Sequence, residues 1–367
     1  MIAHDHYETA VRDKMYGLVS RFKPRCLVHS PVLDRYLAAS LLQKSIRRDE
    51  PELAWQAASY LLENHPAYFW KRLPVIGMED IGVADLDVTM MAILAGTEPE
   101  LREQLGGCLK VATALIEIMC SSTKDRTPDD LYDVISRSIS LREARTMYAD
   151  ENFPGSLPFG LQTEGGVLER ANRLALLAGC AGDVPAVGIR RRRWLEAIQV
   201  IGVEAASNAV QETAILGLLR TGSILSPMLF VAGSEGDQVS TEIDDPLLPA
   251  PDDTAVPVWV LGQHTRIGLA GFRKFASRSS RMKAFLADAM DGSVSRSKVV
   301  GALVFRLDCG QLRRRLDWSL ASELKCQATG LGWGIPDCTV PEAMSILRDE
   351  FDLLNECRAD ALHVYLR

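Results

Sequence analysis

The stretch "SLLQKSIRRDEPELAWQAASYLLENHPAYFWKRLPVIGMEDIGVADLDV", Ser40 to Val88, carries the clearest fold signal in this chain. Its apolar residues recur at three- and four-residue spacing, which is the pattern of amphipathic helices. Pro51 follows Asp49 and Glu50, and proline is well tolerated in the first turn of a helix. This part of the sequence therefore predicts successive helices over 32–48, 52–64, 66–77 and 86–95.

The helical period continues through most of the remaining chain. It predicts further helices over 6–22, 98–121, 128–136, 139–148, 167–180, 189–221, 265–290, 294–307, 311–327 and 340–366. Only the short segment "VPVWVLG", 256–262, has the composition of a strand, and it is too short to imply a sheet. We therefore expect an all-α protein, a multi-helix bundle with a second helical domain.

Composition shifts suggest where the domains meet. Residues 149–166 are dense in proline and glycine, as loops are, and residues 232–257 contain seven acids and no bases. The expected domains are a helical domain over 1–148, a helical continuation over 149–232, an acidic, proline-rich connector over 233–257 and a basic helical domain over 258–367.

The composition excludes several classes of protein. The chain has 367 residues, of which 47% are hydrophobic and 24% charged, and no apolar run is long enough to cross a bilayer. The polar N-terminus does not read as a signal peptide, so we expect a cytoplasmic protein that binds no membrane. The eight cysteines lie far apart without a CxxC pair, which argues against a structural zinc site.

Motifs for cofactor chemistry are missing from the sequence. It contains no G-x-x-x-x-G-K-[ST], no G-x-G-x-x-G after a strand, no H-E-x-x-H and no G-x-S-x-G. We therefore predict no cofactor and no metal.

Positive charge concentrates in one part of an otherwise acidic chain. The net charge is −7, but residues 261–320 contain twelve Lys and Arg against four Asp and Glu. Bases at such density can track a phosphate backbone. The candidate nucleic-acid-binding residues are Arg266, Arg273, Lys274, Arg278, Arg281, Lys283, Arg313, Arg314 and Arg315.

Aromatic residues accompany these bases, namely Phe272, Phe275, Phe285 and Trp318. They could stack on the bases of a single strand. The phenylalanines also fall at helical spacing, which is what a buried face looks like. We favour a buried phenylalanine face with the basic face in solvent.

Three other features raise the question of a catalytic or ligand-binding site. Glu79 and Asp80 are adjacent carboxylates, "HDH" at 4–6 resembles a metal cluster, and His264 begins a predicted helix. Four successive arginines, 190–193, would also suit an anion in the first turn of a helix. In each case we favour a structural or solvent-exposed role.

Residues 36–95 resemble the helical C-terminal region of the RarA/MgsA family of replication-associated AAA+ ATPases, and the likeness extends to about residue 130. Two blocks carry the resemblance. "QKSIRRDEPELA" begins at Gln43, and "YFWKRLPVIGMEDIGVAD" begins at Tyr68 and contains the family's EDIG-x-AD. The residues that form this signature are Lys44, Arg47, Arg72, Glu79, Asp80, Gly82 and Asp85.

The resemblance implies a helical fold, a setting in DNA replication or repair, and self-association, because the family region supports tetramers. It does not imply ATP hydrolysis, since the ATPase module that precedes this region in the family is missing from the sequence. We expect the acids of the second block to pair with Lys44, Arg47, Lys71 or Arg72. Gly82 suits a left-handed helix end, and Asp85 suits the cap of the next helix.

These observations predict a non-enzymatic oligomerisation or adaptor protein in DNA replication, repair or mobile-element maintenance. It would be a homo-oligomer with a basic face that binds DNA. One alternative is a protein-interaction module that binds or mimics a RarA-like AAA+ ATPase. Another is an enzyme that uses Glu79 and Asp80, or His264.

Overall fold

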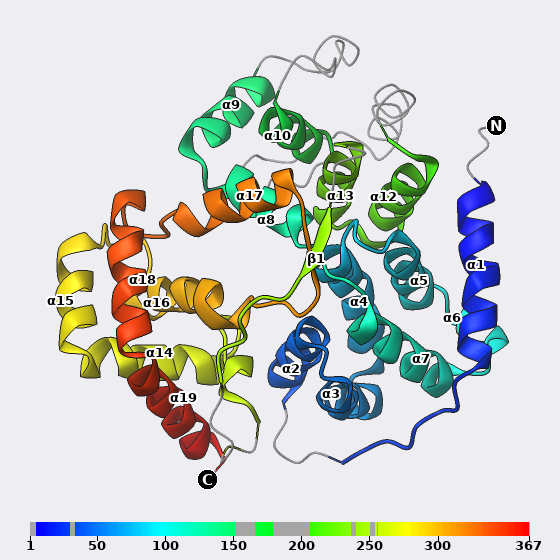
Figure 1. Cartoon of the computed structure of the whole chain (residues 1–367), viewed down its shortest axis with the longest axis horizontal. Coiled ribbons are helices and arrows are strands. Elements are labelled where there is room, and N and C mark those ends of the chain that lie inside the picture. The colour runs from blue at the N-terminus through cyan, green and yellow to red at the C-terminus, as the bar shows by residue number, and fades with distance from the viewer. Residues whose placement is uncertain are drawn as a thin grey trace. The chain divides into compact units, whose positions relative to one another are not determined.

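The computed structural model describes residues 5–29, 34–150, 166–178, 206–235, 240–249, 254 and 256–366. Most of these residues are helical, as the sequence predicts, and one two-stranded sheet is the only sheet within the described ranges (Figure 1). No helix in this part of the chain is long and apolar enough to cross a membrane.

The chain divides into two compact units, each built from three segments. Unit 1 comprises Met1–Arg25, Trp70–Ile243 and Arg314–Ala328; unit 2 comprises Cys26–Phe69, Asp244–Arg313 and Thr329–Arg367. The sequence predicts contiguous domains instead. Composition could not reveal this division, because α2 (Arg35–Arg48) and α3 (Pro51–Asn64) belong to the same unit as segments that begin only at Asp244.

Unit 1 holds most of the helices of the first two-thirds of the chain. They are α1 (Asp5–Ser20), η1 (Gly77–Ile81, a π-helical turn), α5 (Leu86–Thr97), α6 (Pro99–Gln104), α7 (Cys108–Ser121), α8 (Thr127–Arg137), α9 (Ile139–Asp150), α10 (Val167–Leu177), α12 (Asn208–Thr221) and α13 (Leu225–Ser234). The helix α4 (Pro66–Ile76) crosses the boundary into unit 1, and α17 (Ser319–Gly330) begins in it.

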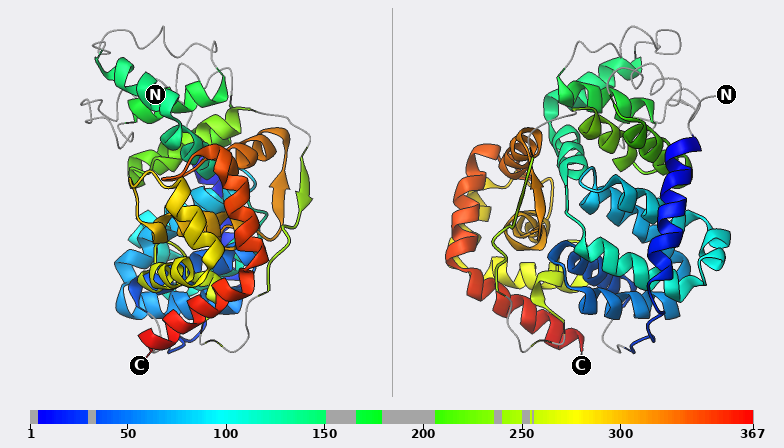
Figure 2. Two further views of the ribbon diagram at one scale, coloured as in Figure 1. Left: turned by 90° about the vertical axis from the view of Figure 1, so that its left-hand side faces the viewer. Right: turned by 45° about the vertical axis from the view of Figure 1, so that its right-hand side comes forward.

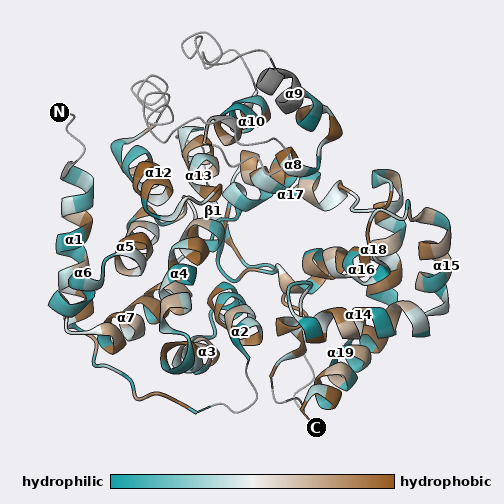
Figure 3. Cartoon of the chain, turned by 180° about the vertical axis from the view of Figure 1, so that it is seen from behind, coloured by the Kyte–Doolittle hydropathy of each residue, from teal (hydrophilic) through white to brown (hydrophobic). Residues whose placement is uncertain are grey.

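The core of unit 1 lies around α5. This helix is buried from Val88 to Ala95 and packs against α1, α7 and α12. The helix α13, which the sequence pattern does not predict, is buried from Leu225 to Ala232 and packs against α8, α10 and α12. The apolar residues of both helices occupy all sides, and both helices are largely brown in Figure 3, which explains why the amphipathic period did not predict α13.

The sheet of unit 1 joins two segments that are far apart in sequence. Strand β1 (Thr241–Ile243) pairs antiparallel with β2 (Arg315–Asp317), so that Glu242 lies opposite Leu316 (Figure 2). The sequence predicts helix over 311–327, but Arg314 has φ +51, which breaks the helical path, and α17 begins only at Ser319. Part of the expected acidic connector is therefore a paired strand.

Unit 2 contains α2 (Arg35–Arg48), α3 (Pro51–Asn64), η2 (Val258–Val260), α14 (Arg266–Arg278), α15 (Ser280–Ala289), α16 (Arg296–Val304), η3 (Phe305–Cys309, a second π-helical turn), η4 (Asp337–Thr339), α18 (Val340–Asp349) and α19 (Phe351–Tyr365). The segment predicted as a short strand forms the 3₁₀ turn η2 instead. Its carbonyls at Trp259 and Val260 accept hydrogen bonds from side chains of α2, which replace the partners a strand would need.

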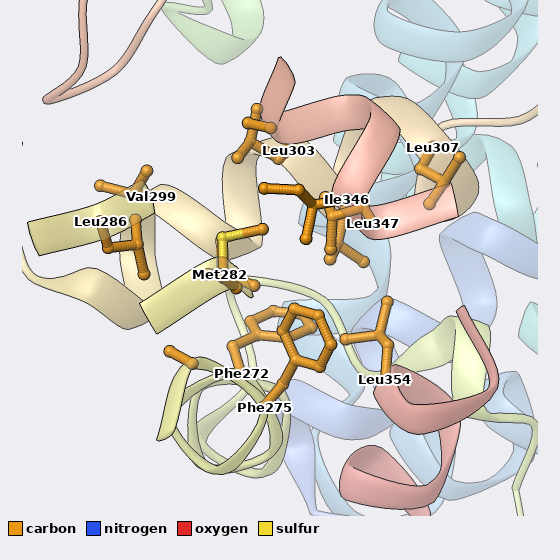
Figure 4. Packing of buried hydrophobic residues seen from close by; sticks show 14 of the residues in the cluster. Phe272, Phe275, Met282, Leu286, Val299, Leu303, Leu307, Ile346, Leu347 and Leu354 are labelled. Carbon is orange, nitrogen blue, oxygen red and sulfur yellow. The ribbon is translucent and has the colours of Figure 1, made fainter. Parts of the chain in front are cut away.

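A hydrophobic cluster forms the core of the α14–α19 part of unit 2. Phe272 and Phe275 of α14 are fully buried and face Leu354 of α19, with Ile346 and Leu347 of α18 above them (Figure 4). Phe285 is 7% exposed and belongs to the same cluster. The preference for buried phenylalanines is confirmed, and none of the three can stack on a nucleic-acid base.

Three predicted helices are each two helices in the structure. The helix over 98–121 is interrupted at Gly106 and Gly107, both at positive φ. The helix over 265–290 is interrupted at Ser279, whose side chain accepts a hydrogen bond from the Met282 amide and caps α15. The helix over 340–366 is interrupted at Glu350. Of the helix expected over 189–221, only α12 lies within the described residues.

Candidate nucleic-acid interface

The adjacent acids of the EDIG motif lie on the π-helical turn η1 in unit 1. The Asp80 side chain is fully buried and Glu79 is 17% exposed. Arg126, at the start of α8, contacts both: its Nη1 lies 2.5 Å from Asp80 Oδ1 and 3.4 Å from Glu79 Oε1. The acids are therefore paired with a base, as expected, but with one that the sequence did not single out.

Further carboxylates surround the same arginine. Arg126 Nη2 also forms an ion pair with Asp129, and the main-chain amide of the neighbouring Asp125 donates to the Asp80 carbonyl at 3.0 Å. Burial alone would lower the pKa of the Arg126 guanidinium, but Asp129, Asp80 and Glu79 hold that pKa well above its ordinary value. The positive charge of Arg126 offsets the negative charge of these carboxylates.

The excess of acids over bases changes their protonation. Burial raises the pKa of the Asp129 carboxyl well above its usual range, with Glu79 and Asp133 adding to the rise against Arg126. Burial likewise raises the pKa of Asp130 to about 7, with Asp133 and Asp125 contributing in the same direction. A raised pKa means that these groups bind protons more readily in the folded protein.

Asp85 has the expected capping role, whereas Gly82 does not form the expected left-handed helix end, because its φ of +57 is combined with ψ −133. Gly82 ends the π-helical turn at φ +57, and a Cβ there would lie 2.4 Å from the Asp125 carbonyl oxygen. Both its backbone conformation and its surroundings therefore require glycine. Asp85 caps α5 by accepting a hydrogen bond from the Val88 amide.

The basic residues of the first block belong to unit 2 and are buried there. Lys44 Nζ donates to the carbonyls of Trp259 and Val260 at 3.0 and 2.8 Å, and Arg47 Nη1 donates to the Cys309 carbonyl at 3.2 Å. Burial lowers the pKa of the Lys44 amine. The expected role for these two bases, pairing with the acids of the EDIG motif, is replaced in the structure by hydrogen bonds to main-chain carbonyls.

One carboxylate lies among the buried bases of unit 2. Asp308, on the π-helical turn η3, is 1% exposed and accepts from two arginines. Arg48 Nη2 lies 2.6 Å from its Oδ1, and Arg358 Nη1 lies 2.8 Å from its Oδ2. Asp308 therefore ties α2 and α19 to the end of α16.

The predicted nucleic-acid face on α14 and α15 divides into two groups. Three of its bases are ion-paired with acids at the end of α18 or on α19, which packs beside α14 (Figure 1). The pairs are Lys274 with Asp360 at 2.6 Å, Arg278 with Glu356 at 3.0 Å and Arg281 with Asp349 at 2.9 Å. These pairs offset the charge that the sequence alone attributes to this face.

The other three bases of these helices are exposed. Arg266, Arg273 and Lys283 form no ion pair with any residue that the structure describes. Arg266 and Arg273 are seven residues apart on α14, which places them two turns apart on the same side of the helix. They are the part of the predicted face that keeps its charge.

The second predicted basic group, 313–315, is divided between the two units. Arg313 belongs to unit 2 and lies 3.8 Å from Asp244. Arg314 and Arg315 belong to unit 1, where they contact the Cys120 carbonyl and Asp317. Trp318 is buried and its indole nitrogen lies 3.5 Å from Asp125, so it is not available for stacking.

The remaining candidates do not form a metal site among the residues that the structure describes. No group of three or more His, Cys, Asp or Glu side chains among the described residues is arranged to hold a metal ion. His264 is exposed, next to Thr265, which caps α14. His4 and the four arginines at 190–193 lie outside the described residues.

Sequence reasoning missed Arg126, Asp308 and Arg358, which hold the two buried charge clusters. Arg126 lies in "KDRTPDD", where a base among acids at a helix start looks like an ordinary surface feature. No signal marks Asp308 or Arg358, because their pairing depends on segments 50 residues apart. Comparison with known protein families, with curated proteins and with solved structures found no match to this chain.

Proposed function

We propose that this chain is a non-enzymatic adaptor that binds nucleic acid in DNA replication, repair or mobile-element maintenance, through the outer faces of α14 and α15. One observation carries the proposal: Arg266, Arg273 and Lys283 are exposed and have no ion-pair partner among the described residues, whereas Lys274, Arg278 and Arg281 are paired. Unpaired bases can release counterions from a phosphate backbone, and paired bases must first give up their acids.

The carboxylates of the EDIG motif support binding over catalysis. Asp80 is buried and pairs with Arg126 at 2.5 Å, and Glu79 contacts the same guanidinium. A general base has to reach a proton on a substrate, and an acid closed off by an arginine is poorly placed for that. These residues are better explained as the connection between η1 and α8.

The setting in DNA metabolism is supported by the two sequence blocks that resemble the RarA/MgsA C-terminal region. Lys44 and Arg47 of the first block are buried, so the block itself is part of the framework and not a contact surface. In our proposal the chain also self-associates, as that family region does. The mass of the purified protein in solution, measured by light scattering, tests this part.

Fluorescence anisotropy with a labelled duplex and a labelled single strand of the same length tests the proposed binding. We expect salt-sensitive binding, and the triple variant Arg266→Ala, Arg273→Ala, Lys283→Ala should weaken it. The slope of log Kd against log salt should fall by about 0.9 on duplex, or about 0.7 on a single strand, for each phosphate that the variant no longer neutralises.

The matched control is the triple variant Lys274→Ala, Arg278→Ala, Arg281→Ala, which removes the same number of bases from the same helices. Because these bases are already paired with acids, we expect a smaller loss of affinity. Equal losses in the two variants would remove the distinction on which the proposal depends. No binding by the wild-type protein at low salt would reject it.

A further inference from the structure

Unit 2 exposes two tyrosines beside the start of α14. Tyr36, at the beginning of α2, is 46% exposed, and Tyr365, at the end of α19, is 45% exposed. Single exposed apolar side chains are common on protein surfaces, whereas aromatic groups gathered at one place often mark a binding site. These two rings come from segments more than 300 residues apart in sequence.

One carboxylate connects the two segments. Asp34 Oδ1 accepts hydrogen bonds from the amides of Tyr36 and Leu37, which caps α2, and Asp34 Oδ2 accepts from the Tyr365 hydroxyl at 3.0 Å. The capping carboxylate therefore holds both tyrosines on the same part of unit 2. Both of its oxygens are engaged in these bonds.

Arginines lie next to these rings. The Arg35 guanidinium is 4.7 Å from the centre of the Tyr36 ring and 5.3 Å from that of Tyr68, and it donates to the Tyr36 hydroxyl at 2.7 Å. Burial and its carboxylate partner raise the pKa of the Tyr365 hydroxyl, whereas the charge of Arg266, the first residue of α14, opposes that rise. We call Arg35, Tyr36, Tyr68, Arg266 and Tyr365 the tyrosine–arginine surface.

The composition of this surface indicates the chemistry of its ligand. Exposed rings offer flat faces on which bases can stack, and the neighbouring arginines offer charge for phosphates. Arg273 continues the positive charge two turns further along α14. Bases inside a duplex are stacked on one another and cannot reach such rings, so the surface suits unpaired nucleotides.

We propose that the tyrosine–arginine surface binds single-stranded nucleic acid, with bases stacked on Tyr36 and Tyr365 and the backbone held by Arg266 and Arg273. This inference rests on the proposed function and names its ligand and the residues that select it. The surface lies wholly within unit 2, because all of these residues belong to its three segments.

The test measures binding of a fluorescein-labelled thymidine 20-mer and of a matched duplex to the full chain by anisotropy. The double variant Tyr36→Ala, Tyr365→Ala should weaken single-strand binding by about 30-fold or more, since stacking on one aromatic ring contributes about 1–3 kcal/mol per base. Duplex binding should change by less than about threefold. Both side chains are exposed, so circular dichroism should show the wild-type fold.

The matched control is Tyr36→Phe with Tyr365→Phe, which keeps both rings and removes only the hydroxyls, and it should retain single-strand affinity within about threefold. If the alanine variant binds the single strand as well as wild type does, the surface is not the site, although nucleic-acid binding through α14 would stand. If the phenylalanine variant is as weak as the alanine variant, stacking is rejected.

Two further outcomes separate this inference from the proposed function. Wild-type protein that binds only duplex would overturn the inference and leave the function in place. Wild-type protein that binds neither probe, and whose self-association is abolished in the alanine variant, would reject both and identify the surface as a protein contact.

Discussion

Two π-helical turns, η1 in unit 1 and η3 in unit 2, each end a helix with a buried carboxylate and are each followed by a glycine, Gly82 and Gly310. Their surroundings have opposite charge. Asp80 on η1 lies among further acids that share Arg126, whereas Asp308 on η3 lies among bases. The same local turn therefore occurs in two clusters, each with a central residue of opposite charge, Arg126 in unit 1 and Asp308 in unit 2.

The two clusters should respond differently when that residue is removed. Carboxylates left unpaired can take up protons and become neutral. Arginines remain charged at all accessible pH values, because their pKa exceeds about 12. The acidic cluster of unit 1 can therefore lower its electrostatic repulsion by binding protons, whereas the arginines of the cluster in unit 2 stay charged.

The largest effect should come from Asp308→Asn. The change leaves Arg48 and Arg358 buried without their carboxylate, and losing one partner of a buried ion pair costs about 3–5 kcal/mol. We expect a loss of this size in the free energy of unfolding, measured with urea, and nearly the same loss at pH 5 and pH 8. Asp349→Asn, which breaks the exposed pair with Arg281, is the control and should cost below about 1 kcal/mol.

Arg126→Met should be nearly as damaging at pH 8 but less so at pH 5. It removes the guanidinium that pairs with Glu79, Asp80 and Asp129, and losing one partner of a buried ion pair costs about 3 kcal/mol or more. The Asp129 carboxyl, whose pKa is raised, takes up a proton at lower pH, which reduces the repulsion among the acids, so the loss should shrink. Urea unfolding at the two pH values gives the comparison, and an equal loss at both would contradict the distinction between the clusters.

Gly82→Ala should destabilise the protein more than Gly310→Ala does. Gly82 has φ +57 and its added Cβ would meet the Asp125 carbonyl oxygen at 2.4 Å, whereas Gly310 has φ −97 and its nearest contact would be 2.9 Å. A non-glycine residue in this sparsely populated backbone conformation, φ +57 and ψ −133, costs about 1–3 kcal/mol before the contact is counted. Thermal unfolding of the two variants tests this ranking, and a larger loss at Gly310 would reverse it.

The smallest effect should come from Asp130→Asn, which changes how the free energy of unfolding depends on pH. The pKa of Asp130 is about 7 in the folded protein against an ordinary value of 3.8, so the folded state binds more protons than the unfolded state between these values. Stability from this group is fully present below about pH 4 and is lost as pH rises through about 7. Asp130→Asn should raise stability at pH 8 by about 1–2 kcal/mol, less than full linkage because the side chain is partly exposed.

Urea unfolding at pH values from 5 to 8 measures the slope of the free energy of unfolding against pH. Asp349→Asn should leave the slope as it is in wild type. A slope in Asp130→Asn as steep as in wild type would show that Asp130 does not titrate as the cluster predicts.

The proposed nucleic-acid surface shows that counting basic residues in the sequence overestimates the charge that is left unpaired. Sequence alone placed nine bases in one group, but the structure pairs Lys274, Arg278 and Arg281 with acids that lie about 70 to 90 residues away. Spacing along a helix indicates which side a base is on, but it does not reveal whether an acid on a neighbouring helix neutralises it. The tyrosine–arginine surface could not be predicted from the sequence for the same reason.

Local sequence was sufficient to predict the helical character, most helix positions, the burial of Phe272 and Phe275, the positive φ at Gly82 and the capping role of Asp85. These follow from rules of period, capping and backbone conformation that act within a few residues. The two discontinuous units, the β1–β2 pairing, and Arg126 and Asp308 as the residues that balance the buried charges emerged only from the folded chain. Such partners depend on which distant segments pack together, because electrostatic pairing acts through space and leaves no fixed spacing in the chain.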